Sequence, residues 1–250
     1  MTLWHIRLKA FVIHLILSVV IITLFLLVVS QIWFPGPLFE LENVWQGLQI
    51  LIPVDAVLGP LLTLILFVPG KKGLKLDLTV IAIFQIGALV YGGLLIYKQR
   101  PVAYAFVVDR FEVVLASEDY FADIPMERFI NEGDNFPLIT YVKPPQSDKE
   151  RSHFLINGIN IKKIADRHYP IRPNMNDIIK HSLDIKTLEN SNEKTKDILS
   201  KFKEKKQSSK ADLIFLPLQA STYKSIIVAI DSGTGEIKQY IPIDPWNKQS

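Results

Sequence analysis

One acidic side chain lies inside an otherwise apolar stretch of this sequence. Asp55 falls within residues 48–68, fourteen of which are Leu, Ile, Val or Phe, and Pro53 and Pro60 lie on either side of it. An ionisable group at membrane depth is costly, and it usually faces protein and pairs with a polar group. Two interpretations stay open. Either Asp55 is protonated or hydrogen-bonded within its own helical bundle, or caps a helix broken at Pro53, or it meets a polar group on another membrane helix.

Residues near Asp55, or at a comparable depth on other segments, are the candidates for binding a partner. Tyr91 is expected at a depth comparable to that of Asp55, and small residues allow helices to approach closely. The small residues of this kind are Gly59, Gly87, Gly92 and Gly93. The candidate partner-binding residues, offered as a hypothesis, are Asp55, Pro53, Gly59, Pro60, Gln85, Tyr91 and Arg100.

Catalytic and metal-binding chemistry has no positive support in the sequence. The chain has no cysteine, which excludes a disulfide scaffold, thiol catalysis and cysteine-based metal sites. It also has no P-loop, no dinucleotide glycine fingerprint and no Gly-x-Ser-x-Gly elbow, and its histidines fall at none of the usual metal-binding spacings. We expect His14 to face the membrane, His168 to lie in a loop with a structural or surface role, and Glu118-Asp119 to serve as turn or cap residues. The sequence therefore predicts no enzyme, no cofactor and no metal site.

Three apolar segments would carry the candidate residues across a membrane. Transmembrane helices are expected at about residues 10–31, 48–68 and 78–97, since roughly 20 apolar residues cross a hydrocarbon layer of about 30 Å. In the second segment the apolar side chains favour insertion by about 4 to 8 kcal/mol, and Asp55 opposes it by up to about 3 kcal/mol. A re-entrant hairpin that breaks at Gly59-Pro60 is an open alternative. The first segment is expected to be a retained anchor, because it is longer than the apolar region of a signal peptide and lacks an A-x-A cleavage pattern.

The distribution of charge predicts an orientation. Residues 1–100 hold four acidic and seven basic side chains, and residues 101–250 hold twenty-one of each, so no basic stripe for nucleic acid is visible. Arg7 and Lys9 precede the first segment, three lysines lie between the second and third, and such positive flanks stay in the cytoplasm. Two basic residues after the third segment argue the other way. We expect a multi-pass protein of the bacterial inner membrane with a cytoplasmic N-terminus and a periplasmic C-terminal domain.

The complete prediction is an α-helical membrane region with three transmembrane helices, residues 1–99, and a soluble α+β domain with terminal β-hairpins, residues 100–250. Pro217 should confine its strand to an edge or a bulge. A helix at 176–182 is expected, and a second at 188–206 has an apolar face formed by Ile198, Leu199 and Phe202. The strands are expected at residues 102–108, 111–115, 136–142, 213–218, 225–230 and 237–243, with a Gly-containing turn between the last two.

Several stretches of the chain together are similar to one known family. They are residues 53–64, Leu76-Asp77-Leu78, residues 85–91, Arg100-Pro101-Val102 leading to Asp109-Arg110-Phe111, and the ending Asp244-Pro245-Trp246. On these residues the chain resembles the type IV pilin accessory proteins (the TfpX/TfpZ group). The resemblance covers residues 1–115 and, less closely, the C-terminal hairpin, whereas residues 145–210 carry little that is diagnostic.

This resemblance implies an inner-membrane factor that helps a type IV major pilin reach the surface as assembled pili, without catalysis. The expected partners are the pilin, through its membrane helix and its periplasmic head, and the lipid bilayer; nucleic acid is not expected, and the oligomeric state is left open. A function of a different class also stays open. Asp55, His14 and Gln85 could line a path in a small-solute transporter or channel subunit, although three helices would then need to form oligomers.

Overall fold

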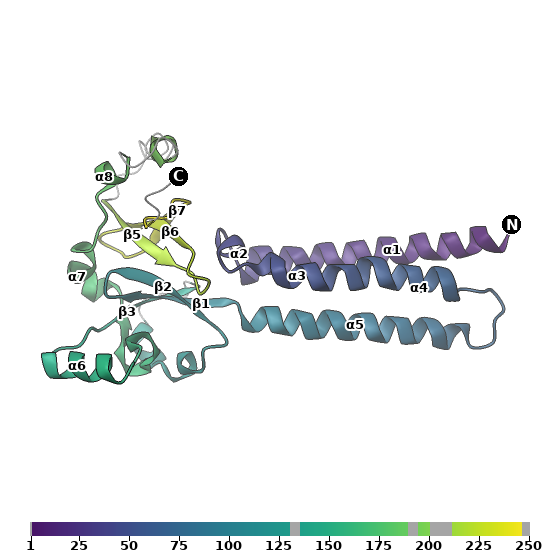
Figure 1. Ribbon diagram of the computed structural model, residues 1–250, viewed down its shortest axis with the longest axis horizontal. Coiled ribbons are helices and arrows are strands. Elements are labelled where there is room, and N and C mark those ends of the chain that lie inside the picture. Colours follow the sequence, from purple (N-terminus) through teal and green to yellow (C-terminus); the bar gives the residue numbers. More distant parts are fainter. Residues whose placement is uncertain (1, 131–135, 190–194, 201–211, 247–250) are drawn as a thin grey trace. The chain divides into compact units, whose positions relative to one another are not determined.

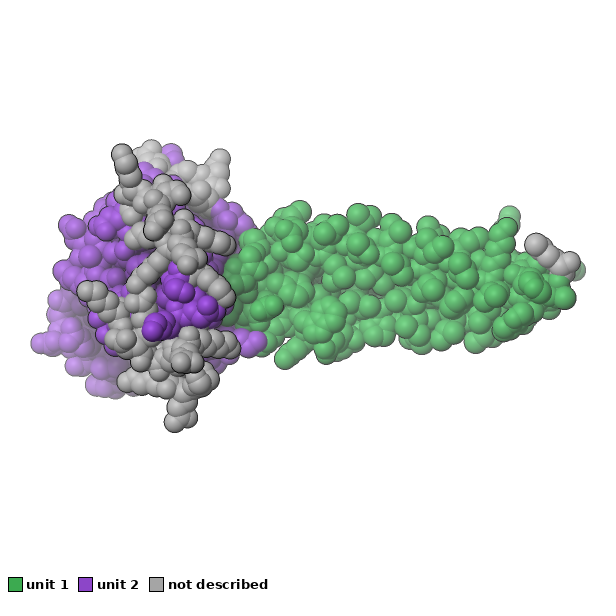
Figure 2. All heavy atoms as spheres, turned by 90° about the horizontal axis from the view of Figure 1, so that it is seen from above, with its two compact units in different colours: residues 1–100 green, residues 101–250 purple. Residues whose placement is uncertain are grey.

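Helices make up most of the first hundred residues, and a β-sheet organises the rest. The computed structural model describes residues 2–130, 136–189, 195–200 and 212–246. The chain divides into two compact units, Met1–Arg100 and Pro101–Ser250, which Figure 2 colours separately. The predicted fold class, a three-helix membrane region followed by a soluble α+β domain, is confirmed.

The first unit contains three helices that are long and apolar enough to span a bilayer (Figure 1). The first span joins α1 (Leu3–Val28) to the π-helix η1 (Val29–Trp33) and is 31 residues long. The short helix α2 (Leu38–Leu41) follows it. The third span is α5 (Leu74–Lys98), which is 25 residues long. The first and third helices begin several residues before the predicted segments, because the polar residues at their starts continue the helix.

The second span is continuous through both of its prolines. It joins α3 (Val44–Pro53), the π-helix η2 (Val54–Leu58) and α4 (Gly59–Leu66) over 23 residues. The alternative of a re-entrant hairpin that breaks at Gly59-Pro60 is therefore wrong. Pro60 lies in the first turn of α4, where a missing N–H is tolerated, and the preceding π-turn absorbs the change in backbone pairing.

The second span packs against both of the others, with α1 along α4 and with α5 along α3 and α4. Small residues permit this at some positions but not at all four that were predicted. A Cβ placed on Gly92 would come within 2.5 Å of Leu51 Cδ1, and one on Gly93 within 3.3 Å of Phe25 Cε2. A Cβ on Gly87 would meet nothing within 4 Å, so Gly87 plays no part in close packing.

The second unit is built on one mixed sheet of seven strands in the order β4-β3-β1-β2-β5-β6-β7. The pairs β1–β3 and β2–β5 are parallel and the other neighbouring pairs are antiparallel. The central strands carry a continuous run of buried side chains, as expected for strands covered on both faces. The strands are β1 (Pro101–Val107), β2 (Arg110–Leu115), β3 (Leu138–Val142), β4 (His168–Pro170), β5 (Leu213–Gln219), β6 (Ser225–Asp231) and β7 (Ile237–Ile241).

Both predicted hairpins are confirmed, as β1–β2 and β6–β7. In the second, the Asp231 carboxylate Oδ1 accepts hydrogen bonds from the backbone N–H groups of Gly233 (2.9 Å) and Thr234 (2.8 Å), and this closes the turn. The same two bonds lower the pKa of Asp231, with the bond from Thr234 contributing most. Gly235 has a φ of +73°, a conformation that glycine adopts without steric cost.

The strand that contains Pro217 is present but was misplaced by the sequence prediction. β5 lies between β2 and β6, so the expectation of an edge or bulged position is wrong. Proline is tolerated here because the ladder between β5 and β2 has only two residue pairs and begins at Leu218, one residue after the proline. At Pro217 itself, β5 is paired only with β6, opposite Ile227.

Short helices connect the strands. The predicted helix at 176–182 corresponds to α7 (Met175–Ile179), whereas α6 (Asp148–Ile156) was not predicted. Within the predicted helix at 188–206, residues 195–200 are helical and Leu199 is fully buried, while Phe202 lies outside the described residues. The remaining elements are α8 (Ile185–Glu189) and the 3-10 helices η3 (Asp119–Asp123), η4 (Met126–Phe129), η5 (Ile161–Lys163), η6 (Ala165–Arg167) and η7 (Arg172–Asn174).

Candidate functional site

The π-helical turn η2 leaves one backbone carbonyl in the middle of the second span without a helical partner. The Gly59 N–H donates to the carbonyl of Val54, five residues earlier, which is the π pattern. The next donor in that pattern, for the carbonyl of Asp55, would be the N–H of residue 60. Residue 60 is proline and has none. A buried carbonyl in a membrane span has to find another donor.

Gln85 on α5 supplies that donor. Through His14 it also forms part of a series of hydrogen bonds that involves all three spans. Its Nε2 donates to the Asp55 backbone oxygen (3.3 Å), and its Oε1 lies 2.9 Å from His14 Nε2 on α1. His14 Nδ1 lies 2.6 Å from the Thr63 hydroxyl on α4. Because an amide oxygen only accepts, His14 Nε2 is the donor in its pair, and a neutral His14 then accepts at Nδ1 from Thr63. The polar network Thr63–His14–Gln85–Asp55 backbone therefore ties the bundle together.

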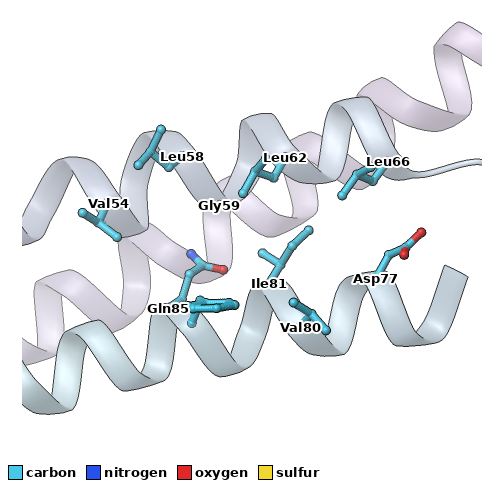
Figure 3. Close-up of a pocket in the computed structure, with 10 residues that line it drawn as sticks. Val54, Leu58, Gly59, Leu62, Leu66, Asp77, Val80, Ile81 and Gln85 are labelled. Carbon is cyan, nitrogen blue, oxygen red and sulfur yellow. The ribbon is translucent and has the colours of Figure 1, made fainter.

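Gly59 makes room for this arrangement. A Cβ on Gly59 would lie 2.0 Å from Gln85 Nε2 and 2.4 Å from its Cδ, so no other residue type fits while Gln85 keeps this conformation. Figure 3 shows the Gln85 amide pointing from α5 toward the backbone at Gly59. The Gly59-Pro60 pair thus has two effects, because the proline removes a backbone donor and the glycine admits its replacement.

The Asp55 side chain itself stands outside the polar network. Asp55 is 5% exposed, and neither of its carboxylate oxygens has a hydrogen-bond partner among the described residues. Gln85 and His14 line the same cavity as the Asp55 side chain and are the polar side chains that influence it electrostatically. A carboxyl group in this position is costly in a bilayer, and such groups mark functional sites more often than structural ones.

Three apolar cavities surround the polar network. One of about 410 Å³ lies between the second and third spans and is lined by residues including Leu58, Gly59 and Gln85 (Figure 3). A second of about 180 Å³ lies between α1 and α5 and includes Asp55. A third of about 420 Å³ is lined mainly by α1, with Thr63 and Phe67 from the second span and its end. None is polar enough for a soluble substrate, because aliphatic side chains dominate each lining.

Comparison with known proteins identifies the family. Residues 2–42 match the family model described as fimbrial assembly protein FimB. The chain is 30% identical over 115 residues to the fimbrial assembly protein of serogroups C1 and C2 of Dichelobacter nodosus, and the match covers 45% of this chain and 88% of that protein. The chain belongs to the fimbrial assembly protein family. No solved structure matches it.

Two further relatives of this chain are longer than the matched region. They are the fimbrial assembly proteins of serogroups I and E1 of Dichelobacter nodosus, 31% and 30% identical over 115 residues. In both, the match covers 45% of this chain and 45% of the relative, so the chain aligns with about half of their length. The family match at residues 2–42 includes His14 but ends before Asp55.

The structure brings five of the seven candidate residues of this chain together and leaves two apart from them. Pro53, Asp55, Gly59, Pro60 and Gln85 lie together around η2. Tyr91 is 68% exposed and lies apart from them, so its comparable depth does not make it a partner of Asp55. Arg100 lies at the end of the unit, with its guanidinium 3.7 Å from the centre of the Tyr97 ring.

For two members of the polar network the sequence interpretation fell short. His14 was expected to face the membrane, and this is wrong, because both of its ring nitrogens are engaged by other helices. Thr63 had not been singled out, although it is 4% exposed. The signal that could have identified them is that His14, Asp55, Thr63 and Gln85 are rare polar side chains in apolar segments, and such groups tend to meet.

The polar side chains His168 and Glu118 of the second unit form hydrogen bonds within that unit. His168 was expected in a loop, but it begins β4 and is fully buried between Thr140 Oγ1 (2.9 Å) and the Lys162 carbonyl (2.8 Å). Burial lowers the pKa of His168. Glu118 accepts from the Leu115 N–H (3.2 Å), as expected of a turn residue. Among the described residues, no group of three or more His, Asp or Glu side chains could hold a metal ion.

Proposed function

We propose that this protein is an inner-membrane accessory factor that assists the assembly or surface display of a type IV pilin. Its membership of the fimbrial assembly protein family carries the proposal, because the relatives are named fimbrial assembly proteins. The three helices that are long and apolar enough to span a membrane support a location in the bilayer that a membrane-anchored subunit would occupy. The family link to the TfpX/TfpZ group is part of this proposal.

The proposed contacts are of two kinds, one with the membrane helix of the pilin and one with its periplasmic head. The candidate residues around η2 support the first, since a buried carboxyl group faces neighbouring helices there. Exposed apolar side chains support the second. Leu155 and Ile156 at the end of α6 are 76% and 82% exposed, and exposed apolar clusters are common at protein interfaces.

The second contact requires the domain after residue 100 to lie in the periplasm. The lysines and arginines of the N-terminus and of the loop after the second span support this orientation. Fusing alkaline phosphatase or a fluorescent protein to the C-terminus tests it directly. Phosphatase activity without fluorescence is expected, and fluorescence without phosphatase activity would place the domain in the cytoplasm and contradict the proposal.

Deleting the gene and counting surface pili beside total pilin tests the function. Fewer pili with unchanged pilin would indicate a role in assembly, whereas loss of both would indicate protection of the pilin from degradation. Restoring the intact gene should restore pili in either case. Unchanged numbers of surface pili in the deletion strain would contradict the proposed function.

A second candidate function is that of a small-solute transporter or channel subunit. The observation that favours it is that His14, Gln85 and Asp55, three polar residues from three spans, meet inside the bundle. Proton or solute flux into liposomes that contain the purified protein, absent in empty liposomes, would favour this function. Absence of flux, together with loss of pili in the deletion strain, would favour the accessory role.

A further inference from the structure

A groove between the first and third spans leads to the Asp55 carboxylate. Its cavity of about 180 Å³ is walled on one side by α1 and on the other by α5, and Asp55 from η2 is its one lining residue from the second span. Gln85 and His14 line the same cavity.

The nearby Gln85 and His14 make their hydrogen bonds to other groups, and the second N–H of the Gln85 amide makes none to either carboxyl oxygen of Asp55. The Gln85 amide donates to the Asp55 backbone carbonyl, and both ring nitrogens of His14 are engaged by Gln85 and Thr63. Both carboxylate oxygens lack a hydrogen-bond partner among the described residues. Water does not meet such needs in the hydrocarbon layer. The groove therefore has an acceptor that a donor from another molecule would satisfy.

The rim of the groove shows that this molecule must itself lie in the membrane. Leu17, Ile21 and Ile86 are 57%, 49% and 62% exposed, so the groove opens sideways between apolar side chains at membrane depth. Its volume suits one side chain rather than a helix, because a protein cavity of about 150 Å³ accepts a molecule the size of benzene. A helix lying across the rim could insert one side chain toward Asp55.

We propose that this groove, which we call the Asp55 groove, receives from the membrane helix of the pilin one side chain that donates a hydrogen bond to Asp55. The donor is a hydroxyl, an amide, a protonated carboxyl or a cationic group. The inference rests on the proposed function for the identity of the partner. It adds the side of the bundle on which the partner lies and the chemistry that recognises it.

A photo-cross-linking residue at Ile21, compared with one at Val19, tests the location. Both side chains are 49% exposed aliphatic residues on α1, but they lie about 200° apart around the helix, and only Ile21 lines the Asp55 groove. The full-length protein is expressed together with the pilin, and cross-linked pilin is measured after irradiation of intact membranes. Cross-linking from Ile21 and little from Val19 is expected. Equal cross-linking from both, or a cross-link from Ile21 to a second copy of this chain, would overturn the proposal.

Asp55→Leu and Asp55→Asn test the chemistry in the same cross-linking experiment. Loss of one interhelical hydrogen bond weakens helix association about 3- to 20-fold, so Asp55→Leu should lower the Ile21 cross-link by a factor in that range. Asp55→Asn keeps an accepting oxygen and should therefore retain more of the cross-link than Asp55→Leu does. Cross-linking that stays unchanged in Asp55→Leu would overturn the role of the carboxylate. Equal amounts of each variant in the membrane fraction serve as the control for folding.

The outcome separates this inference from the proposed function. If deletion of the gene removes pili but Ile21 never cross-links to pilin, the Asp55 groove is excluded and the accessory function stands. If deletion leaves pili unchanged, the accessory function is excluded, and specific cross-linking of pilin from Ile21 would then support the groove as a pilin-binding site without a role in assembly.

Discussion

Gly59→Ala is the substitution that most directly tests the polar network. The new Cβ would fall 2.0 Å from Gln85 Nε2, so Gln85 has to leave its position. A glutamine side chain can rotate away at little steric cost. The loss is in its two hydrogen bonds, to His14 Nε2 and to the Asp55 carbonyl. Interhelical hydrogen bonds in membranes contribute about 0.6 kcal/mol on average and up to about 1.7 kcal/mol, so the expected destabilisation is about 1 to 3 kcal/mol.

Gly87→Ala is the matched control for this substitution. It makes the same chemical change in a membrane helix, and a Cβ there would meet nothing within 4 Å. The gain of about 0.5 to 1 kcal/mol from replacing a helical glycine with alanine applies to both variants, so the difference between them isolates the effect on Gln85. The free energy of unfolding of the full-length protein, from titration with a denaturing detergent in mixed micelles and followed by circular dichroism, measures this difference.

Repeating the comparison in a Gln85→Ala variant tests the same prediction more strictly. In Gln85→Ala the long side chain is gone, and Gly59→Ala should then behave as Gly87→Ala does. The coupling between positions 59 and 85 should therefore be similar in size to the loss caused by Gly59→Ala alone. Equal stability of Gly59→Ala and Gly87→Ala, or a loss at Gly59→Ala that persists in the Gln85→Ala background, would refute the account of the network.

Three further predictions concern the second unit, measured by amide hydrogen exchange in the full-length protein. Burial lowers the pKa of His168, so the unfolded state binds more protons than the folded state as the pH falls below about 6.5. Protection of β3 and β4 from exchange should therefore fall in that range, by at most about 1.4 kcal/mol per pH unit. The His168→Gln variant should show a weaker dependence on pH. Ser147→Ala removes the oxygen that accepts from the Glu150 N–H (3.2 Å) and should cost the first turn of α6 about 1 kcal/mol, with exchange elsewhere unchanged. Lys162→Met leaves two carboxylates without their cation at 3.4 and 3.6 Å and should cost about 1 to 3 kcal/mol, whereas Lys180→Met, at a pair whose lysine is 69% exposed, should cost less than about 1 kcal/mol; similar losses in both lysine variants would contradict the structural role of Lys162.

The membrane spans and the hairpins could be predicted because each depends on a local signal. Length and apolarity alone define the three spans. The turn around Gly233 and Gly235 defines the β6–β7 hairpin, where Asp231 closes the chain on itself. The short elements gave no such signal. β4 is three residues long, and its place in the sheet depends on pairing with β3. The hydrogen-bonded residues Thr140 of β3 and His168 of β4 are 28 positions apart in the sequence.

The position of β5 shows a different limit of sequence reasoning. The rule that proline belongs at an edge is correct for a fully paired strand. In this sheet β5 is an interior strand, but its ladder to β2 is short and does not reach Pro217. At Pro217 the side of β5 that faces β2 is therefore unpaired, as it would be in an edge strand. The length of a ladder is set by where two distant strands diverge, and nothing near Pro217 in the sequence reports it.

The Asp55 site could be predicted in part, and what could not be predicted changes how it should be tested. The sequence identifies Asp55 as a polar residue in need of a partner, and the simplest expectation is that its side chain is bound within the bundle. Instead, Pro60 leaves the Asp55 carbonyl without a helical donor, Gly59 admits Gln85 to it, and the network with His14 is completed through the backbone oxygen. The carboxylate takes no part in that network. A leucine at position 55 should therefore leave the bundle intact, or stabilise it by removing a costly group from the bilayer, while any partner that needs the carboxylate is lost. Stability and partner binding can thus be separated at this residue, which Gly59 and Gln85 do not allow.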